Sequence, residues 1–253
     1  MIRVLLALLL FSFPATAWCA AERVVSLNLC TDQMLVLLAP EKVVGLTPLA
    51  RDPALSFVAR QAAGLPVVHP SAEAVLGLHP DLVLAAPFGA QATVAVLAAL
   101  GLRVLRVGLP DDFAGIRAET IRVAAALGVP ERGAGLIAAM DARLASLPRP
   151  VRRHTAIAWE PRGYTSGPGT LMDAVLRAAG LTNVGNGRPL GREALLRDPP
   201  DLLVVPQAPV FPSLATGIFD DPALARIRRR TLPPALTLCA GPFTARAVSI
   251  LAQ

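Results

Sequence analysis

Residues 71–87 read SAEAVLGLHPDLVLAAP, and the same pattern returns at residues 191–207 as GREALLRDPPDLLVVPQ. The identical positions are Glu73, Ala74, Leu76, Pro80, Asp81 and Leu82 in the first copy, and Glu193, Ala194, Leu196, Pro200, Asp201 and Leu202 in the second. Ser71 suits a helix N-cap, and Glu73 falls in the first helical turn, where its charge suits the helix dipole. The repeat therefore predicts a short helix, a turn and a buried strand, built once in each of two similar halves.

Strand-like and helical patterns alternate on both sides of each copy. Between residues 22 and 128 the strand-like runs are RVVSLNL, KVVGLT, DLVLAAP and LRVLRVG, with helical patterns between them. The alternation resumes after residue 150 with HTAIAW, TLMDAVLRAAG, REALLRD, DLLVVP, PALARIRRR, ALTLC and PFTARAVSILAQ. Strands that are apolar on both faces and separated by helices indicate mainly parallel sheets covered on each side. We predict an N-terminal α/β lobe over residues 22–128 and a C-terminal α/β lobe over residues 150–253.

The segment between the lobes, residues 129–149, has the pattern of one long helix. Pro130 suits a first helical position, and an apolar stripe recurs at helical spacing, made by Ile137, Met140, Leu144 and Leu147. From residue 131 to residue 147 such a helix would be about 25 Å long. We interpret it as a strut between the lobes. A crossover helix inside one continuous sheet is the alternative.

The first 21 residues have the layout of a secretory signal peptide. They contain Arg3, an apolar run over residues 4–13, Pro14 and small residues up to Ala21. The apolar run is shorter than the roughly 20 residues that cross a bilayer. We predict cleavage after Cys19 or Ala21 and export to the periplasm, and an uncleaved anchor is the alternative.

The charge does not predict a nucleic-acid partner. The net charge is +6, but every basic residue other than Lys42 is arginine, and most of the arginines are scattered along the chain. A high arginine content can also reflect genome composition.

The predicted mature chain retains two cysteines, Cys30 and Cys239. An even number of cysteines in an exported protein is typical of disulfide bonding. A disulfide that closes so long a loop would stabilise the fold by roughly 4 to 5 kcal/mol. Two buried free thiols that pack as small hydrophobic groups are the alternative.

The order of these patterns resembles the periplasmic substrate-binding proteins of ABC importers. The stretches that carry the resemblance are RVVSLNLCTDQMLVLLAPEKVVGLT, SAEAVLGLHPDLVLA, GTLMDAVLRAAGLTNVG and REALLRDPPDLLVV. The resemblance is to the class that serves iron-siderophore, haem and cobalamin uptake and, in a sister branch, zinc and manganese uptake. It implies two three-layer α/β lobes with mainly parallel sheets, joined by one long α-helix, in a protein that acts as a monomer.

The resemblance also assigns a role to the repeated glutamate. In such proteins a glutamate on each lobe docks against arginines of the membrane permease, so Glu73 and Glu193 are the predicted docking residues. The alternative is that both side chains merely complement helix dipoles, which stabilises by about 0.3 to 1 kcal/mol each.

Ligands of open α/β sheets bind beyond the carboxyl ends of the strands. In two facing lobes that rule selects residues 28–32, 48–51, 87–89, 159–164, 206–208 and 239–242. Trp and Tyr offer apolar contact with a polar end, and Arg can pair with an anion or stack on a ring. The predicted ligand-binding residues are Asn28, Arg51, Phe88, Trp159, Arg162, Tyr164 and Gln207. The alternative is that Trp159 fills the core and Arg162 is solvated.

Two other classes of function were weighed. A bare-metal receptor of the zinc and manganese branch needs converging ligands, and His69, His79 and His154 form no convergent set in the sequence. An exported α/β enzyme could use SGPGT, residues 166–170, to hold an anion, but Thr170 also suits a simple helix cap. The chain has no P-loop, GxSxG or HExxH motif. We therefore expect no catalysis and no resident cofactor, and a ferric siderophore, haem or cobalamin as the ligand.

Overall fold

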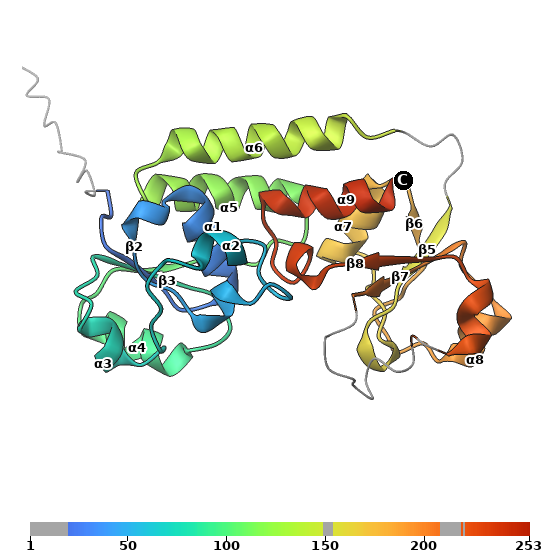
Figure 1. The fold of residues 1–253 in the computed structure, drawn as a ribbon, viewed down its shortest axis with the longest axis horizontal. Helices are drawn as coiled ribbons and strands as arrows, with labels where there is room; N and C mark the ends of the chain where they lie inside the picture. The colour runs from blue at the N-terminus through green and yellow to red at the C-terminus, as the bar shows by residue number, and fades with distance from the viewer. Residues whose placement is uncertain (1–19, 149–153, 208–218, 220) are drawn as a thin grey trace, which may run out of the picture.

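The computed structural model describes residues 20–148, 154–207, 219 and 221–253 (Figure 1). Residues 1–19 of the predicted signal peptide, residue 149 of the predicted strut and residues 150–153 of the predicted C-terminal lobe lie outside the described residues. None of the helices in the described ranges combines the length and the apolar content that a membrane span requires.

The N-terminal lobe is built on a parallel sheet with the strand order β2-β1-β3-β4. Its strands are β1 (Val24–Ser26), β2 (Val43–Gly45), β3 (Leu82–Ala85) and β4 (Val104–Arg106). Its helices are α1 (Leu29–Leu38), α2 (Ala59–Ala62), α3 (Ala72–Leu76), α4 (Gln91–Ala99) and α5 (Phe113–Ala126). Successive strand side chains point to opposite faces. Val24 accordingly packs in the core shared with α1 and α5, and Val25 in the core shared with α3 and α4. The lobe therefore has three layers.

The C-terminal lobe repeats this design with the parallel order β6-β5-β7-β8. Its strands are β5 (Thr155–Ala158), β6 (Thr182–Asn183), β7 (Leu202–Pro206) and β8 (Arg229–Leu232), and its helices are α7 (Leu171–Ala178), α8 (Arg192–Arg197) and α9 (Ala245–Leu251). Ala156 and Leu202 face the core with α7 and α9, while Ile157 and Leu203 face the core with α8. The predicted fold class, two three-layer α/β lobes with parallel sheets, is confirmed.

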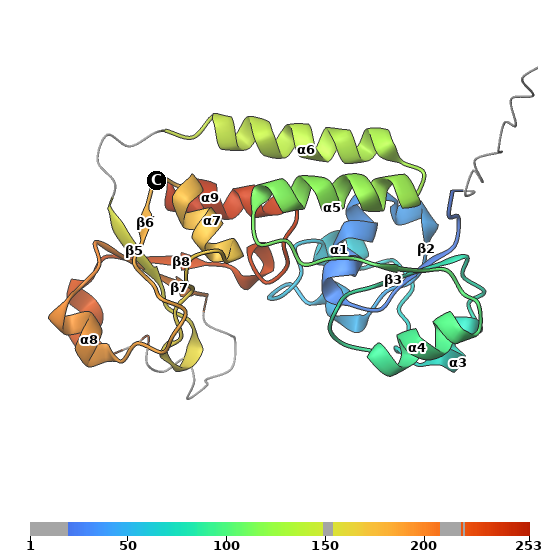
Figure 2. The same cartoon turned by 180° about the vertical axis from the view of Figure 1, so that it is seen from behind.

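The connecting segment forms one helix, α6 (Pro130–Ala145), which runs along α5 of the first lobe and α9 of the second (Figures 1 and 2). Met140 of its apolar stripe is buried against Ile116 of α5 and Ala245 of α9. An ion pair between Arg117 and Asp141, 2.5 Å from Nη2 to Oδ1, also fastens α6 to α5. Because the described strands form two separate sheets, the alternative of a crossover helix inside one sheet is wrong.

The repeated aspartate ties together the first and third strands of each lobe in chain order. The Asp81 carboxylate accepts the backbone N–H of Arg23, 3.1 Å from its Oδ1, just before β1. In the second lobe Asp201 Oδ2 accepts the N–H of Thr155 at 2.8 Å, where β5 begins. Each N–H lies at a strand entry, where the carboxylate supplies its acceptor. The Asp of the repeated sequence therefore has the same structural role twice.

The alternation of strand-like and helical runs after residue 150 implies a strand at ALTLC, and that expectation is wrong. The run ALTLC, residues 235–239, is not a strand: β8 lies just before it at Arg229–Leu232, and Pro234–Leu236 forms a single turn of 3-10 helix. The physical reason is the pair Pro233 and Pro234, which have no N–H to give to a sheet ladder. The strand β6, two residues long, is too short to leave a pattern in the sequence.

Candidate functional site

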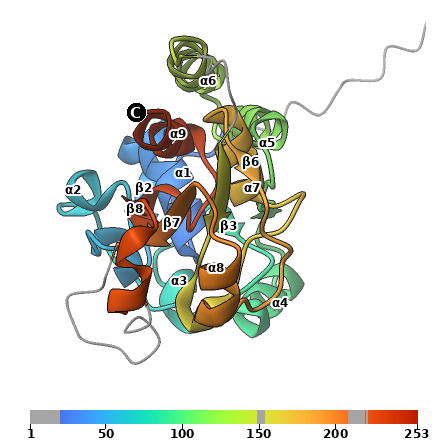
Figure 3. The ribbon, with the colours of Figure 1, turned by 90° about the vertical axis from the view of Figure 1, so that its right-hand side faces the viewer.

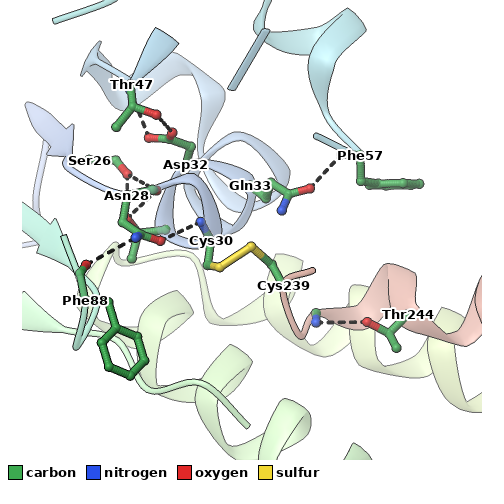
Figure 4. The surroundings of a disulfide bond; sticks show 12 residues. Ser26, Asn28, Cys30, Asp32, Gln33, Thr47, Phe57, Phe88, Cys239 and Thr244 are labelled. Carbon is green, nitrogen blue, oxygen red and sulfur yellow. Dashed lines mark hydrogen bonds between the residues drawn. A yellow bond between two sulfur atoms is a disulfide. The ribbon is translucent and has the colours of Figure 1, made fainter. Parts of the chain in front are cut away.

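A disulfide joins the two lobes beyond the carboxyl ends of one strand from each sheet. Cys30 follows β1 and Cys239 follows β8, and their sulfurs are 2.09 Å apart (Figure 4). The sequence left open whether these residues are bonded or free, and in the structure they are bonded. The disulfide therefore lies where the carboxyl-end edges of the two lobes meet, the region in which the sequence predicts the ligand site.

Aromatic and apolar contacts beside the disulfide hold the lobes together. Phe57 of the first lobe stacks on Phe243 of the second, with ring centroids 4.7 Å apart and an interplanar angle of 11°. The Arg246 guanidinium lies 4.6 Å from the centroid of the Phe57 ring, a cation–π contact. Leu29 of α1 is part of the core of the second lobe. The junction is therefore a packed interface as well as a covalent one.

Asp32 is a buried acid just behind this junction. Its Oδ2 accepts the hydroxyl of Thr47 at 2.5 Å, and its Oδ1 accepts the Thr47 N–H at 3.2 Å (Figure 4). Burial raises the pKa of Asp32 from 3.8 to about 7, against the lowering effect of these hydrogen bonds. The carboxyl group connects α1 to the loop that follows β2, so it fixes the start of the 48–51 segment.

A cavity of about 350 Å³ lies at the carboxyl end of the second lobe's sheet. We call it the carboxyl-end cavity. Its walls are mainly apolar and include Met172, Val204, Leu232 and Leu238. Leu238 is 54% exposed and directly precedes the disulfide residue Cys239. The sequence predicted a pocket formed by both lobes, whereas the residues that line this cavity all belong to the C-terminal lobe and adjoin the junction through Leu238.

The polar lining of the carboxyl-end cavity consists of Glu160, Ser166, Thr170 and Thr237. Glu160 follows β5, and burial raises the pKa of its carboxyl group. In the described part of the chain, no donor or cation is bonded to that carboxyl group. The cavity therefore combines apolar walls with a few hydrogen-bonding groups, as small-molecule sites usually do.

The first lobe brings two of its predicted ligand-binding residues together. Asn28 caps α1, with its Oδ1 accepting the Cys30 N–H at 2.8 Å, and its Nδ2 donates to the carbonyl oxygen of Phe88 at 3.3 Å. Asn28 thus lies between the Phe88 loop and the disulfide (Figure 4). The Phe88 side chain is 69% exposed, so it can contact a ligand at the junction. A ligand role for Asn28 and Phe88 stays a prediction.

Arg51 has a structural role that the sequence did not predict. Its guanidinium donates to the carbonyl oxygens of Ala62, at 3.3 Å, and Leu65, at 2.5 Å. These carbonyls lie at the end of α2 and just after it, where helical carbonyls lack partners and a basic side chain can bind them. The guanidinium is therefore bonded to its own lobe, although Arg51 is exposed, and a ligand contact of Arg51 stays a prediction.

The prediction that Trp159 binds the ligand is wrong. Trp159 is 0% exposed, and its Nε1–H donates to the Leu190 carbonyl oxygen at 3.0 Å. Its ring meets the edge of Phe219, with centroids 5.6 Å apart. The reason is its position: it directly follows β5 on the face that packs with α8, so its side chain fills that core. The alternative reading, a core tryptophan, holds.

The other predicted residues of the second lobe remain accessible. Arg162 is exposed and has a left-handed backbone, with φ 62°, and Tyr164 is 51% exposed. Gln207 is exposed after β7, with its N–H bonded to the Leu232 carbonyl oxygen at 2.8 Å. Their ligand contacts stay predictions. Ala208, the last residue of the predicted 206–208 loop, lies outside the described residues.

None of the described residues that line the carboxyl-end cavity is among the predicted ligand-binding residues. The predicted residues of the second lobe are aromatic, arginine or glutamine side chains, whereas the lining consists of aliphatic residues, Met172, hydroxyls and Glu160. The sequence nevertheless carried signals, because Glu160 and Pro206 lie in the selected loops 159–164 and 206–208, and Ser166 and Thr170 belong to the SGPGT segment. Apolar residues at strand ends are common in cores, so position alone does not single them out.

The two short helices that carry the repeated glutamates lie on the same side of the molecule. Helices α3 and α8, which carry Glu73 and Glu193, both lie on the side opposite α6 in three views (Figures 1–3). Both residues are exposed. Glu193 pairs with Arg192, 3.0 Å from Oε1 to Nε, and Arg192 also pairs with Asp221 at 2.8 Å. The arrangement is one that a flat partner surface could contact at two points.

The structure bears on two alternatives: a bare-metal site and an anion site at the SGPGT segment. Across the described ranges, no group of three or more His, Cys, Asp and Glu side chains is placed to hold a metal ion. In the SGPGT segment, Thr170 caps α7 by accepting the Asp173 N–H at 3.2 Å. The helix-cap interpretation of Thr170 is confirmed.

Known proteins share both sequence and fold with this chain. A family model described as periplasmic binding protein matches residues 24–228. A cobalamin-binding protein of Halobacterium salinarum is 28% identical over 198 residues, which cover 72% of this chain and 53% of that protein. This chain thus spans about half the length of the Halobacterium relatives that it matches.

Solved structures extend the comparison. The periplasmic heme-binding protein RhuT of Roseiflexus sp. RS-1 is 26% identical with a TM-score of 0.72, covering 92% of this chain and 97% of that one. The periplasmic vitamin B12 binding protein BtuF of Vibrio cholerae is 18% identical with a TM-score of 0.65, covering 92% of this chain and 95% of that one. At 18% identity, the likeness to the vitamin B12 binding protein is a likeness of fold.

Proposed function

The chain belongs to the periplasmic binding protein family, and from that premise we propose that it captures a metal chelate and delivers it to an ABC permease. The proposal describes a monomer in the periplasm, exported by its N-terminal segment. The observation that carries it is the carboxyl-end cavity, whose lining includes Leu238, the residue before Cys239 of the disulfide that joins the two lobes.

The chemistry of this region supports a bulky organic ligand. The cavity walls are mainly apolar and include the exposed Leu238. In the first lobe, the carbonyl oxygen of the exposed Phe88 accepts a hydrogen bond from Asn28, two residues before Cys30 of the disulfide. Apolar walls with a few polar groups suit an organic molecule that buries surface and is oriented by a few hydrogen bonds. A bare ion would instead need several converging charged ligands. A metal wrapped in an organic chelator fits better than a free metal ion.

The names of two relatives support a metal chelate as the ligand. A relative from Halobacterium salinarum is named a cobalamin-binding protein, and a structural neighbour of 26% identity is named a heme-binding protein. Both names refer to metals held in flat organic rings. We propose that the ligand is such a chelate, a haem or a cobalamin, or a ferric siderophore. The proposal includes no catalytic step.

Delivery rests on Glu73 and Glu193. Their helices α3 and α8 lie on the same side of the two lobes, opposite α6 (Figure 3). A role limited to the helix dipoles does not require the two helices to share one face, whereas docking does. Exposed charge pairs of this kind control association rate and partner choice more than affinity.

Ligand capture is tested by titrating the mature protein separately with hemin, cyanocobalamin and ferrichrome while following absorbance and intrinsic tryptophan fluorescence. We expect saturable 1:1 binding of at least one chelate with a Kd of about 1 μM or tighter, equivalent to roughly 8 kcal/mol. Zinc and manganese salts serve as controls for bare-metal binding. If none of the chelates binds at 100 μM, or if only the bare ions bind, the chelate proposal fails.

Docking is tested with the double variant Glu73→Arg and Glu193→Arg. We expect chelate uptake by cells to fall at least tenfold, because both surface charges are reversed, while chelate affinity of the purified protein stays within twofold. The matched control is Glu131→Arg, which changes an exposed glutamate on α6, on the opposite side. Normal uptake by the double variant would rule out these two residues as the docking contacts.

A further inference from the structure

The polar groups of the carboxyl-end cavity are all neutral or acidic. The lining residues with polar side chains are Glu160, Ser166, Thr170 and Thr237, and none of the described lining residues is Arg, Lys or His. Arg162, two residues after Glu160, is exposed and is not among the cavity's described lining residues. Among the described lining residues, a bound ligand therefore has a carboxyl group and hydroxyls as polar neighbours and no cation.

The loop geometry fixes the position of Glu160. Its N–H donates to the Tyr164 carbonyl oxygen at 2.7 Å, and its own carbonyl oxygen accepts the Gly163 N–H at 3.0 Å. This tight loop holds the backbone at the carboxyl end of β5. Within the described residues, the carboxyl group itself has no hydrogen-bond donor or ion-pair partner. Burying part of a carboxyl group without a hydrogen-bond partner costs free energy, and a bound ligand could supply the missing hydrogen-bond donor.

The hydroxyls add acceptors and donors around that carboxyl group. Thr170 is already engaged, because its hydroxyl donates to the Gly167 carbonyl oxygen at 2.8 Å. The Ser166 and Thr237 hydroxyls make no hydrogen bond to other described residues. They can each accept from a ligand or donate to it. The side-chain polar groups that remain available to bind a ligand are therefore one carboxyl group and two hydroxyls, in a wall that is otherwise mainly apolar.

We propose that Glu160 sets ligand specificity: it accepts hydrogen bonds from carboxamide N–H groups on the edge of the chelate and disfavours chelates whose edge carries carboxylates. A carboxamide supplies an N–H for Glu160 and a carbonyl oxygen for Ser166 or Thr237. A carboxylate would bring a second acidic group beside Glu160 with no lining cation to offset it, and like charges in a partly buried site repel. This inference rests on the proposed function and narrows it to a carboxamide-bearing chelate.

The experiment measures the Kd of cyanocobalamin, whose ring carries carboxamides, and of hemin, whose ring carries carboxylates, at pH 7.5. We expect the wild-type protein to bind cyanocobalamin at least tenfold more tightly than hemin. In Glu160→Gln, an uncharged variant of nearly the same shape, we expect that ratio to fall about tenfold, mainly through tighter hemin binding. Glu131→Gln is the matched control on α6 and should leave the ratio unchanged.

A second variant guards against a folding artefact. Thr237→Val removes a hydroxyl and no charge, so it should weaken cyanocobalamin binding by about threefold to tenfold while hemin stays disfavoured. Thermal unfolding of each variant establishes that it is folded.

The outcomes separate this inference from the proposed function. A wild-type preference for hemin or ferrichrome, or an unchanged ratio in Glu160→Gln, overturns the role of Glu160 and leaves chelate capture standing. Failure of the wild-type protein to bind any of the three chelates overturns both.

Discussion

Asp32 is a carboxylic acid enclosed behind the junction of the two lobes, and it gives the fold a predictable response to pH. Burial raises its pKa from 3.8 to about 7. Between these values the unfolded chain has lost this proton and the folded chain has kept it, so folding stability falls as the pH rises. The contribution of Asp32 is fully present below about pH 4 and is lost as the pH passes through about 7.

We therefore predict that Asp32→Asn removes this component of the pH dependence. An asparagine can accept the Thr47 N–H and donate to the Thr47 hydroxyl, so the contact survives without charge. Between pH 4 and pH 8, the wild-type free energy of unfolding should fall relative to the variant, by at most on the order of 4 kcal/mol. Urea denaturation of both proteins over this range measures the difference. Parallel curves would show that Asp32 does not titrate there.

Trp159 is predicted to matter for stability and not for binding. Trp159→Phe removes the N–H that the Leu190 carbonyl oxygen accepts, and it leaves a small void beside Phe219. We expect a loss of about 1 to 3 kcal/mol in the free energy of unfolding and a chelate Kd within twofold of the wild-type value. Denaturation and ligand titration of the same sample measure both. If the variant had normal stability but had lost chelate affinity, Trp159 would be a ligand-binding residue after all.

The residue scale is where sequence reasoning was least complete. The loops at the carboxyl ends of the strands could be located, because they follow from the strand pattern, and their role in ligand binding stays a prediction. The sequence could not decide which side chains in those loops point inward. Trp159 and Tyr164 lie five residues apart in one loop, yet one is fully buried and the other is 51% exposed. Arg51 looked free in the sequence, but its partners, Ala62 and Leu65, are set by tertiary structure.

At the scale of elements, α6 is held to the N-terminal lobe by a close approach at Gly133. A Cβ added there would lie 2.6 Å from the Cβ of Ala124 on α5, closer than packed atoms allow. We predict that Gly133→Ala pushes α6 from α5 and destabilises the protein by about 1 to 3 kcal/mol. Thermal or urea unfolding measures this loss.

The same helix offers a matched control two residues further on. Gly135 has nothing within 4 Å of the position of an added Cβ. Gly135→Ala should therefore stabilise the protein by up to about 1 kcal/mol, because alanine favours a helix more than glycine does. If both variants were stabilised equally, the close packing of α6 against α5 would be contradicted.

Element types were largely predictable, for reasons visible in particular segments. The helix α6 was predicted from Pro130 and its apolar stripe, and it begins at Pro130 as expected. The apolar residues of the run 235–239 have the pattern of a strand, but Pro233 and Pro234 provide no N–H for the sheet and so prevent one from forming. The two-residue strand β6 has no sequence period at all.

At the scale of the whole molecule, the disulfide fastens two lobes whose cysteines are 209 residues apart. We predict that Cys30→Ser combined with Cys239→Ser lowers the free energy of unfolding by roughly 5 kcal/mol, since the unfolded chain regains the freedom of a long loop. Urea denaturation measures the loss. A reductant should lower the stability of the wild-type protein toward that of the variant and should not change the variant. A reductant without effect on the wild-type protein would show that the bond does not stabilise it.

The repeat explains why the whole architecture could be predicted. Two copies of one motif indicated two lobes, and the lobes have the same strand order and the same aspartate contact at a strand entry. The position of the cavity could not be predicted, because it is formed by segments of the C-terminal lobe that lie far apart in the chain, among them Met172, Val204 and Leu238.

The proposed function requires a metal chelate to bind where the two lobes join, beyond the carboxyl ends of their strands. Anomalous X-ray diffraction from crystals grown with the bound chelate locates its cobalt or iron atom and tests this binding site. We expect one strong peak next to the carboxyl-end cavity, between Phe88 of the first lobe and Leu238 of the second. A peak on the outer face near α3 or α8, or no peak at saturating chelate, would contradict it.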